Sequence, residues 1–245
     1  MSLRTLRRAV ALGFALTACV LDYWRMSLRG PMTLERRAVW LQRSSRRVLG
    51  SLGIRVSVEG RPPQRGLIVS NHLSYLDILI LSAAAPCFFV SKAEIDRWPY
   101  FGWAARAGGT IFIVRGNRAS AEVTAAEMAR RLKLDVPVLL FPEGTSTDGN
   151  RVRRFHLRLM QPAIDAEAPI TAAAVRYRIE GGIPERELCW FGDAPFLPHL
   201  WKALGTAGFS AELRFGEPRV YADRRAAAAE THAEVEAMRK PSAKI

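Results

Sequence analysis

The sequence predicts an α/β fold: a mixed, mostly parallel central sheet flanked by helices, preceded by an N-terminal membrane-associated helical segment. Short apolar runs rich in β-branched residues alternate from residue 54 onward with helical stretches, as buried parallel strands and their crossover helices do. Before residue 54, an apolar run flanked by arginines precedes a basic amphipathic stretch. We therefore divide the chain into N-terminal anchoring helices (1–53), a main domain (54–225) and an Ala-rich tail (226–245).

The overall composition excludes several classes of protein. With 49% hydrophobic and 24% charged residues, the chain is too apolar to be disordered. Three widely spaced cysteines (Cys19, Cys87 and Cys189) exclude a disulfide framework and a cysteine-based metal cluster. The 36 Lys and Arg against 23 Asp and Glu give a net charge of +13, which favours an anionic partner: nucleic acid, an acidic bilayer or a phosphorylated substrate.

Residues 1–60 hold eleven of the arginines against three acidic residues, and they enclose the apolar run 9–21. Thirteen residues are few for a membrane span, which needs about 20. Tyr23 and Trp24 follow the run at the place of an interfacial aromatic belt. We favour a helix lying shallowly in an anionic leaflet. A tilted span and a cleaved signal, with Leu16–Cys19 resembling a lipoprotein cleavage box, are the alternatives. For the basic helix predicted over 32–52, the alternative is a solvated helix that covers the next domain.

In the main domain, predicted strands alternate with predicted helices. Strands are predicted over 54–59, 67–70, 87–90, 110–114, 136–141, 170–179, 187–191 and 211–215. Helices are predicted over 77–85, where Pro86 ends the helix, over part of 93–107, over 120–134 and in the tail from 226. In such sheets, functional groups gather on the loops that follow the strands.

The loop after strand 67–70 holds His72 and Asp77. Five residues along a helix turn by about 140°, so the two side chains meet only across a strand–turn–helix junction, with Asp77 in the first helical turn. In that arrangement a neutral histidine can take a proton from a hydroxyl while the carboxylate fixes its tautomer. The alternative is an aspartate that caps the helix beside an incidental histidine.

Two further loops follow predicted strands. Arg115 ends strand 110–114 and can pair with a phosphate, although an arginine at a strand end is commonly a surface charge. After strand 136–141, Glu143, Gly144 and Thr145 form a turn that can orient a polyol or an anionic headgroup. Alone, that turn is ordinary turn chemistry.

Taken in order, these blocks resemble the glycerolipid acyltransferase family, the 1-acyl-glycerol-3-phosphate acyltransferases. They read Asn-His-x-Ser-x-x-Asp from Asn71, Gly-x-Ile-Phe-Ile-x-Arg up to Arg115, and Phe-Pro-Glu-Gly-Thr up to Thr145. The apolar segment 168–174 is similar to the family's fourth block. The resemblance runs from about residue 55 to 220.

The resemblance implies an O-acyltransferase that moves a fatty acyl group from acyl-CoA or acyl-ACP to the free hydroxyl of a lysolipid. The favoured acceptor is 1-acyl-glycerol-3-phosphate, which gives phosphatidic acid. His72 would be the base and Asp77 its orienting partner, and the substrate-binding residues would be Asn71, Ser74, Arg115, Glu143, Gly144 and Thr145. The resemblance implies no bound cofactor, no metal and no covalent acyl-enzyme.

The expected partners are membrane lipids and, as one of two donors, acyl carrier protein. Because thioester donors are cytosolic, the expected location is the cytoplasmic face of the inner membrane. Nucleic acid is not expected, because the largest basic cluster flanks an apolar helix. A catalytically inactive membrane-binding module is the other class considered, and the intact pair of His72 and Asp77 argues against it.

Two departures from the family pattern leave the acceptor open. Ser146 stands where members acting on acylglycerol phosphate often have arginine, and the segment 155–158 lacks their Phe-Lys-x-Gly. Arg151, Arg153 or Arg154 could replace the lost cation. The third block also resembles a bacterial branch that acylates lyso-ornithine lipid, whose headgroup lacks phosphate.

Overall fold

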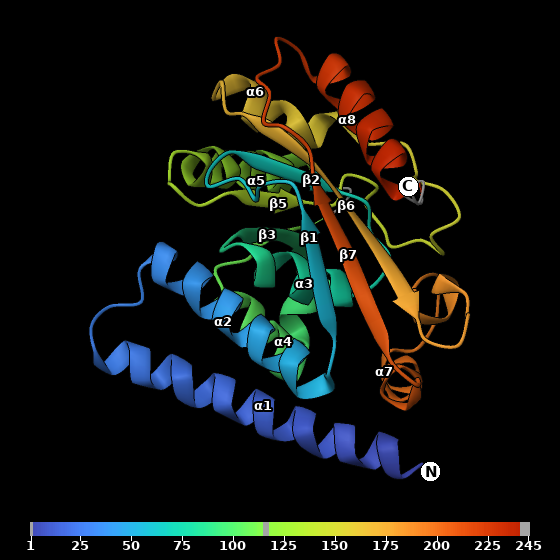
Figure 1. The fold of residues 1–245 in the computed structure, drawn as a ribbon. Helices are drawn as coiled ribbons and strands as arrows, with labels where there is room; N and C mark the ends of the chain where they lie inside the picture. The colour runs from blue at the N-terminus through green and yellow to red at the C-terminus, as the bar shows by residue number, and fades with distance from the viewer. Residues whose placement is uncertain (1, 115–117, 241–245) are drawn as a thin grey trace.

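A computed structural model describes residues 2–114 and 118–240. It contains a seven-stranded sheet in the order β1-β7-β6-β2-β5-β3-β4, in which only β6 and β7 pair antiparallel (Figure 1). The strands are β1 Arg55–Glu59, β2 Leu67–Ser70, β3 Phe88–Lys92, β4 Ile111–Ile113, β5 Val138–Leu140, β6 Ile170–Ile179 and β7 Phe209–Phe215. The predicted mixed, mostly parallel sheet is confirmed. Since β2, β4 and β5 run parallel, the loops that follow them leave the same edge of the sheet.

Helices cover both faces of the sheet (Figure 1). One face carries α1 Leu3–Leu28, α2 Leu34–Leu52, α3 Leu76–Ala84, α4 Pro99–Ala107 and α7 Phe196–Gly205. The other carries α5 Arg118–Leu132, α6 Gln161–Asp165 and α8 Arg224–Arg239. Short 3₁₀ helices span Ala93–Arg97 (η1), Leu157–Met160 (η2) and Glu185–Leu188 (η3). Each face has its own hydrophobic cluster: Ile68 of β2 joins one, while Leu67 and Val69 join the other.

The strand predicted over 187–191 is wrong. The chain forms η3 there, with backbone bonds from Glu187 to Pro184 and from Cys189 to Arg186. Trp190 then donates its backbone N–H to Leu73 O rather than to a strand. Leu188 and Cys189 are buried, as they would be in a strand, and belong to the hydrophobic cluster that includes Leu73 of the loop after β2. Apolar residues stand here because the segment is buried, and in the sequence such a short apolar run looks like a strand.

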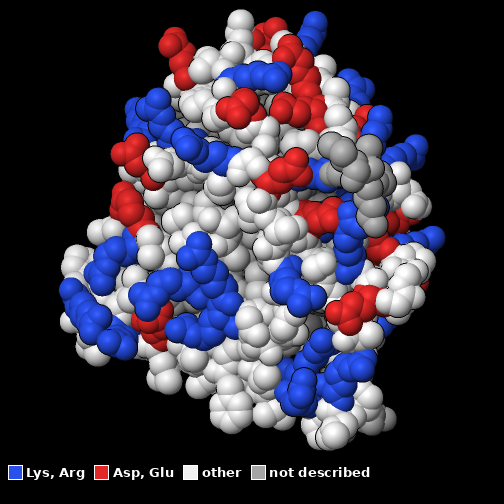
Figure 2. Space-filling model, in the orientation of Figure 1, with Lys and Arg blue, Asp and Glu red and all other residues white. Residues whose placement is uncertain are grey.

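Helix α1 is longer than the apolar run that predicted it. It spans 26 residues, begins with Ser2, whose hydroxyl accepts from Thr5 N, and carries its arginines within the helix. One side of α1 packs on α2, where Trp40 Nε1 donates to Cys19 O at 2.9 Å. The helix predicted over 32–52 is confirmed as α2. It covers the main domain through α3 and exposes arginines over the lower left of the face in Figure 2.

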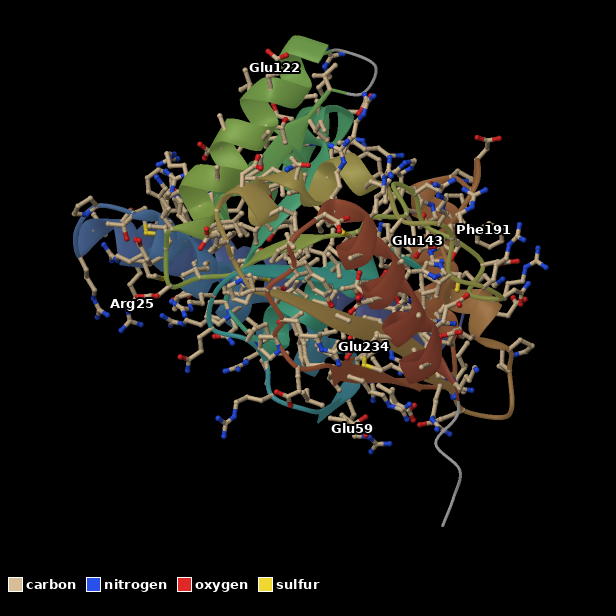
Figure 3. The ribbon with its side chains drawn as sticks, turned by 90° about the horizontal axis from the view of Figure 1, so that it is seen from above. Arg25, Glu59, Glu122, Glu143, Phe191 and Glu234 are labelled. Atoms are coloured by element: carbon tan, nitrogen blue, oxygen red, sulfur yellow. The ribbon has the colours of Figure 1, made fainter. Side chains whose placement is uncertain are left out.

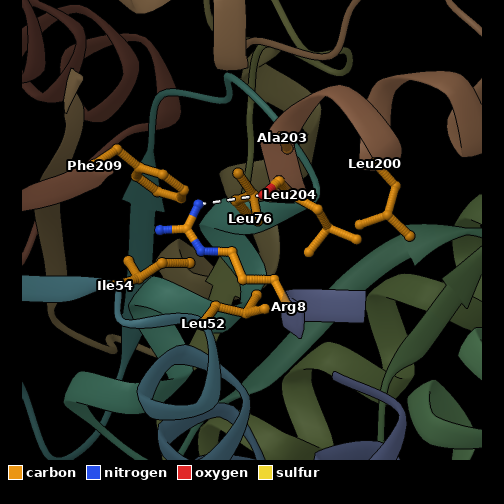
Figure 4. A pocket seen from close by; sticks show the side chains of 8 residues that line it. All are labelled: Arg8, Leu52, Ile54, Leu76, Leu200, Ala203, Leu204 and Phe209. Atoms are coloured by element: carbon orange, nitrogen blue, oxygen red, sulfur yellow. Dashed lines mark hydrogen bonds between the residues drawn. The ribbon is translucent and has the colours of Figure 1, made fainter. Parts of the chain in front are cut away.

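The N-terminal half of α1 is fixed to α7 by Arg8. Its guanidinium crosses a small pocket whose other lining residues are apolar, and it donates to Leu204 O and Thr206 O at the end of α7 (Figure 4). A cation at these carbonyls also complements the α7 dipole. Burial is the main cause that lowers the pKa of Arg8, so this guanidinium is partly removed from water.

The outward side of α1 carries a stripe of exposed apolar residues. Phe14 is 74% and Leu28 86% exposed. At 100° per residue the whole set lies within an arc of about 80°. The set comprises Leu3, Leu6, Val10, Phe14, Leu21, Trp24 and Leu28. By length and composition α1 could also cross a membrane, and 22% of its most apolar window is buried. We call these seven residues the α1 stripe.

Candidate active site

His72 and Asp77 meet at the junction between β2 and α3. The chain leaves the sheet after Ser70, turns, and enters α3 at Leu76, so that Asp77 lies in the first helical turn. His72 Nδ1 and Asp77 Oδ2 are 2.8 Å apart. The histidine side chain is 20% exposed, whereas Asp77 is completely buried. The strand–turn–helix arrangement predicted from the spacing therefore brings the two side chains together.

Three donors besides His72 hold the Asp77 carboxylate. Its Oδ2 accepts backbone N–H groups of Leu73 at 2.6 Å and Ser74 at 3.0 Å, and its Oδ1 accepts the hydroxyl of Tyr177. Burial, followed by the charge of Asp77, raises the pKa of Tyr177 well above its ordinary value, so the phenol stays a donor. These donors satisfy the buried carboxylate and fix its orientation.

Sequence reasoning missed Tyr177 because this residue lies 100 positions after Asp77, on β6. Its one local signal is a buried tyrosine between two arginines, in a strand whose other inward residues are small or aliphatic. A buried phenol needs a hydrogen-bond partner, which is the physical content of that signal.

Phe141 and Thr147, on either side of the Glu143 turn, fix His72. The ring of Phe141 stacks on the imidazole with centroids 4.0 Å apart and planes 13° apart. Thr147 donates its backbone N–H to His72 O at 2.9 Å, and its hydroxyl donates to the same oxygen at 3.2 Å. Within the described ranges no residue hydrogen-bonds Nε2 of His72, so that nitrogen is available to a substrate.

Glu143 connects the loop after β2 with the loop after β5. Its buried carboxylate accepts His72 N through Oε1 and Arg153 N through Oε2, each at 2.7 Å. Burial is the main cause that raises the pKa of Glu143, and the two backbone bonds oppose the rise. Glu143 and Phe191 lie toward the same end of the molecule, away from Arg25 of α1 (Figure 3). The structure therefore places Glu143 against backbone, where it sets the positions of His72 and of the arginine-rich loop 151–154.

Two more predicted residues of the first loop contact backbone. The buried Asn71 amide donates to Val175 O at 3.1 Å and accepts Val175 N at 2.8 Å, which extends the ladder between β2 and β6 by one residue. Ser74 is also buried, and its Oγ accepts Leu76 N at the start of α3.

The third loop supplies the remaining described residues. Gly144 has φ of +72°, which the turn after β5 requires and which glycine adopts without strain. Thr145 is half-buried in the same turn. The predicted Arg115 lies outside the described residues.

The arrangement suits proton transfer at Nε2. When the carboxylate accepts from Nδ1, a neutral ring presents the lone pair of Nε2, and an imidazolium formed there would be stabilised by Asp77. The described part of the chain holds no group of three or more His, Cys, Asp or Glu side chains that could bind a metal. All three cysteines are buried and free.

Comparisons with known proteins agree with this geometry. A family model described as "Acyltransferase" matches residues 53–176. The lyso-ornithine lipid O-acyltransferase of Pseudomonas aeruginosa is 36% identical over 212 residues, covering 85% of this chain and 80% of that protein. The 1-acyl-sn-glycerol-3-phosphate acyltransferase of Neisseria meningitidis is 38% identical over 177 residues, covering 67% of this chain and 68% of that protein.

A solved structure supports the fold over the whole chain. It is the 1-acyl-sn-glycerophosphate acyltransferase PlsC from Thermotoga maritima, with a TM-score of 0.70 and 16% identity, covering 97% of this chain and 96% of that one. At that identity the likeness concerns the fold, whereas the family rests on the sequence matches. On those matches, the chain belongs to the acyltransferase family and is an O-acyltransferase.

Proposed function

We propose that this enzyme transfers a fatty acyl group from a thioester to the free hydroxyl of a lysolipid, with His72 as general base and Asp77 as its positioning partner. The hydroxyl proton moves to Nε2 of His72 while the oxygen attacks the thioester carbonyl. The C–O bond forms, the C–S bond breaks, and the leaving thiolate takes the proton back from His72. The single observation that carries the proposal is the 2.8 Å contact between His72 and a fully buried Asp77, with Nε2 open.

The step needs no nucleophilic side chain. Donor and acceptor need only be held in attack geometry beside one base, and rigid placement of that base contributes much of the rate. Three sets of contacts hold His72: Phe141 stacks on the ring, Asp77 contacts Nδ1, and the backbone donates its N–H to Glu143 and accepts from Thr147 at its carbonyl oxygen. In this proposal Glu143 supports the base, and we propose no bound cofactor.

For the acceptor we propose lyso-ornithine lipid. An ornithine headgroup linked through its α-amine presents one carboxylate and one ammonium in place of a phosphate. The loop after Glu143 offers matching charges: Asp148 is partly exposed, and Arg151, Arg153 and Arg154 are exposed beside it. Ser146 carries no charge to bind a phosphate. The Pseudomonas relative, which matches most of this chain, is named for that acceptor.

Acylglycerol phosphate is the second candidate acceptor. It is favoured by the Neisseria relative, which is named for it at 38% identity. In this case Arg151, Arg153 or Arg154 would supply the cation for the phosphate.

We propose that α1 lies in the surface of an anionic membrane. The α1 stripe faces away from the domain, while the opposite side of α1 is held by Arg8 on α7 and by the 3.0 Å ion pair of Arg43 with Asp22. A helix bound to its own domain at both of these places suits a monotopic helix better than a span surrounded by lipid. Arg7 and Arg25, at its two ends, can reach lipid phosphates. Because thioester donors are cytosolic, we propose the cytoplasmic face.

The test is product analysis by mass spectrometry. Purified enzyme on phosphatidylglycerol vesicles receives one isotope-labelled acyl thioester, as acyl-CoA or as acyl-ACP in separate reactions, and an equal mixture of lyso-ornithine lipid and 1-acylglycerol phosphate. We expect labelled ornithine lipid from the wild type and a loss of about 10²–10⁴-fold in His72→Ala. Labelled phosphatidic acid alone would establish the second candidate, and no product from either acceptor would contradict the proposal.

A further inference from the structure

Arg239 is the last residue of α8, far from the three sequence blocks, yet its guanidinium is only 10% exposed. It makes three short contacts. Nη1 donates to Val175 O at 2.6 Å, and Nη2 donates to Gly149 O and to Glu185 Oε2, both at 2.7 Å. One planar cation thus binds β6, the third loop and η3 together.

Two of these acceptors, Val175 and Glu185, are connected to His72 or Asp77 through one further residue. Val175 O also accepts from the amide of Asn71, the neighbour of His72 in the chain. The second oxygen of Glu185 accepts Tyr177 N at 2.6 Å, and Tyr177 donates its hydroxyl to Asp77.

The third contact reaches His72 through the loop after β5. Gly149 lies two residues after Thr147, which donates to His72 O. Arg239 therefore bonds three segments that connect to the supports of the dyad: β6, the loop after β5 and η3.

The end of α8 is itself anchored, so the guanidinium has a defined origin. Arg214 of β7 donates to Met238 O at 2.7 Å and to Lys240 O at 3.1 Å, on either side of Arg239. Buried Ala227, Ala228 and Val235 pack α8 into the hydrophobic cluster of its face.

The loop backbone fits closely around this guanidinium. Gly149 has φ of +82°, and a Cβ placed there would lie 3.0 Å from Glu185 Oε2 and 3.2 Å from Arg239 Nη2. A side chain at this position would crowd the ion pair and would strain a backbone that glycine adopts freely.

We infer that Arg239 is a positioning residue: through Val175, Gly149 and Glu185 it holds the supports of the His72–Asp77 dyad, which makes α8 a working part of the active site. The inference rests on the proposed roles of His72 and Asp77. It gives the C-terminal helix a role in the reaction although no side chain of α8 need touch substrate.

The test compares Arg239→Gln with Arg225→Gln, an exposed arginine on the same helix. Displacing catalytic groups by about 1 Å costs up to 10²-fold in rate, so we expect kcat to fall about 10–100-fold in Arg239→Gln. KM for both substrates should stay within threefold, because the guanidinium is buried. Arg225→Gln should match the wild type in both constants. Circular dichroism and thermal unfolding establish that each variant is folded.

A second readout does not depend on turnover. Histidine-selective ¹⁵N NMR, with the His72 signal assigned through His72→Ala, should show a shifted or broadened Nδ1 resonance in Arg239→Gln and an unchanged one in Arg225→Gln. An enzyme that transfers no acyl group but shows this change would refute the proposed reaction and leave the positioning role standing.

Two further variants cover a failure of Arg239→Gln to fold. Arg239→Lys keeps the charge but reaches fewer acceptors, and Gly149→Ala crowds the same ion pair. In both variants we expect kcat to fall by a larger factor than that by which KM changes. Wild-type kcat with an unchanged His72 signal in folded Arg239→Gln or Arg239→Lys would overturn the inference. A change confined to KM would also overturn it, because it would place Arg239 in substrate binding.

Discussion

Replacing Asp77 tests the proposed division of labour within the dyad, and the structure distinguishes two replacements. Asp77→Ala leaves three buried donors without an acceptor: Leu73 N, Ser74 N and the Tyr177 hydroxyl. Each buried unsatisfied donor costs about 1–3 kcal/mol. The total is comparable to the whole free energy of unfolding of a typical domain, about 5–15 kcal/mol. We therefore expect Asp77→Ala to be poorly folded and uninformative about catalysis.

Asp77→Asn removes the charge and keeps an acceptor for His72 and for the two backbone N–H groups. The two backbone N–H groups at the Oδ2 position select the amide oxygen for that place, which still accepts from His72 Nδ1. The amide nitrogen then faces Tyr177, whose hydroxyl can accept from it. The tautomer of His72 is preserved, so the loss is confined to the stabilisation of the imidazolium.

The size of that loss follows from the contact. Unit charges about 4 Å apart interact by about 4 kcal/mol at an effective dielectric constant of about 20, which corresponds to at most about 10³ in rate. We expect kcat of Asp77→Asn to fall about 10²–10³-fold, with the midpoint of thermal unfolding lowered by about 2–12 °C because the buried Tyr177 hydroxyl loses its acceptor. The assay is acyl transfer under saturating donor and acceptor, and the matched control is the exposed Asp193→Asn. Asp77→Asn that folds normally and keeps more than a third of kcat would refute the role assigned to Asp77.

Three other substitutions test separate parts of the structure. Tyr177→Phe removes one donor to Asp77 and should lower kcat about tenfold with KM unchanged, since one hydrogen bond to a charged group contributes about 1.5–3 kcal/mol; equal kcat in steady-state assays would contradict this. Glu143→Gln turns one amide N–H toward a backbone donor, so we expect the thermal midpoint to fall by about 2–12 °C in calorimetry; an unchanged midpoint would disprove the support role. Phe14→Asp in the α1 stripe should weaken sedimentation with phosphatidylglycerol vesicles at least tenfold, whereas the control Val123→Asp on α5 should not; equal binding would exclude the α1 stripe as the membrane contact.

Much of the fold and half of the site follow from local sequence pattern. The alternation of short apolar strands and helices predicts the class of fold. Parallel strands need crossover connections, and the crossover helices then cover the faces of the buried sheet. The spacing of His72 and Asp77 requires a strand–turn–helix junction, which forms through local hydrogen bonds from the backbone N–H groups of Leu73 and Ser74 to the Asp77 carboxylate. The third block lies near the first because both loops leave the same edge of a parallel sheet.

Other features depended on contacts between distant segments. The pattern over 187–191 predicted a strand because burial and strand pairing look alike in a short run, and only the packed structure shows η3 there. Glu143 and Asn71 could be singled out as site residues from sequence. That their polar atoms bind the backbone of His72 and Val175 became visible only in the folded structure.

The sequence by itself determined the type of fold and the pairing of His72 with Asp77, because these depend on residues within a few positions of one another. Only the tertiary structure decided what holds the dyad. Tyr177 of β6 bonds Asp77 directly, and Arg239 of α8 bonds the segments that support the dyad; both lie 100 or more residues further along the chain. Their roles follow from which buried polar groups meet after folding, and the need of each such group for a partner has no fixed spacing in the sequence.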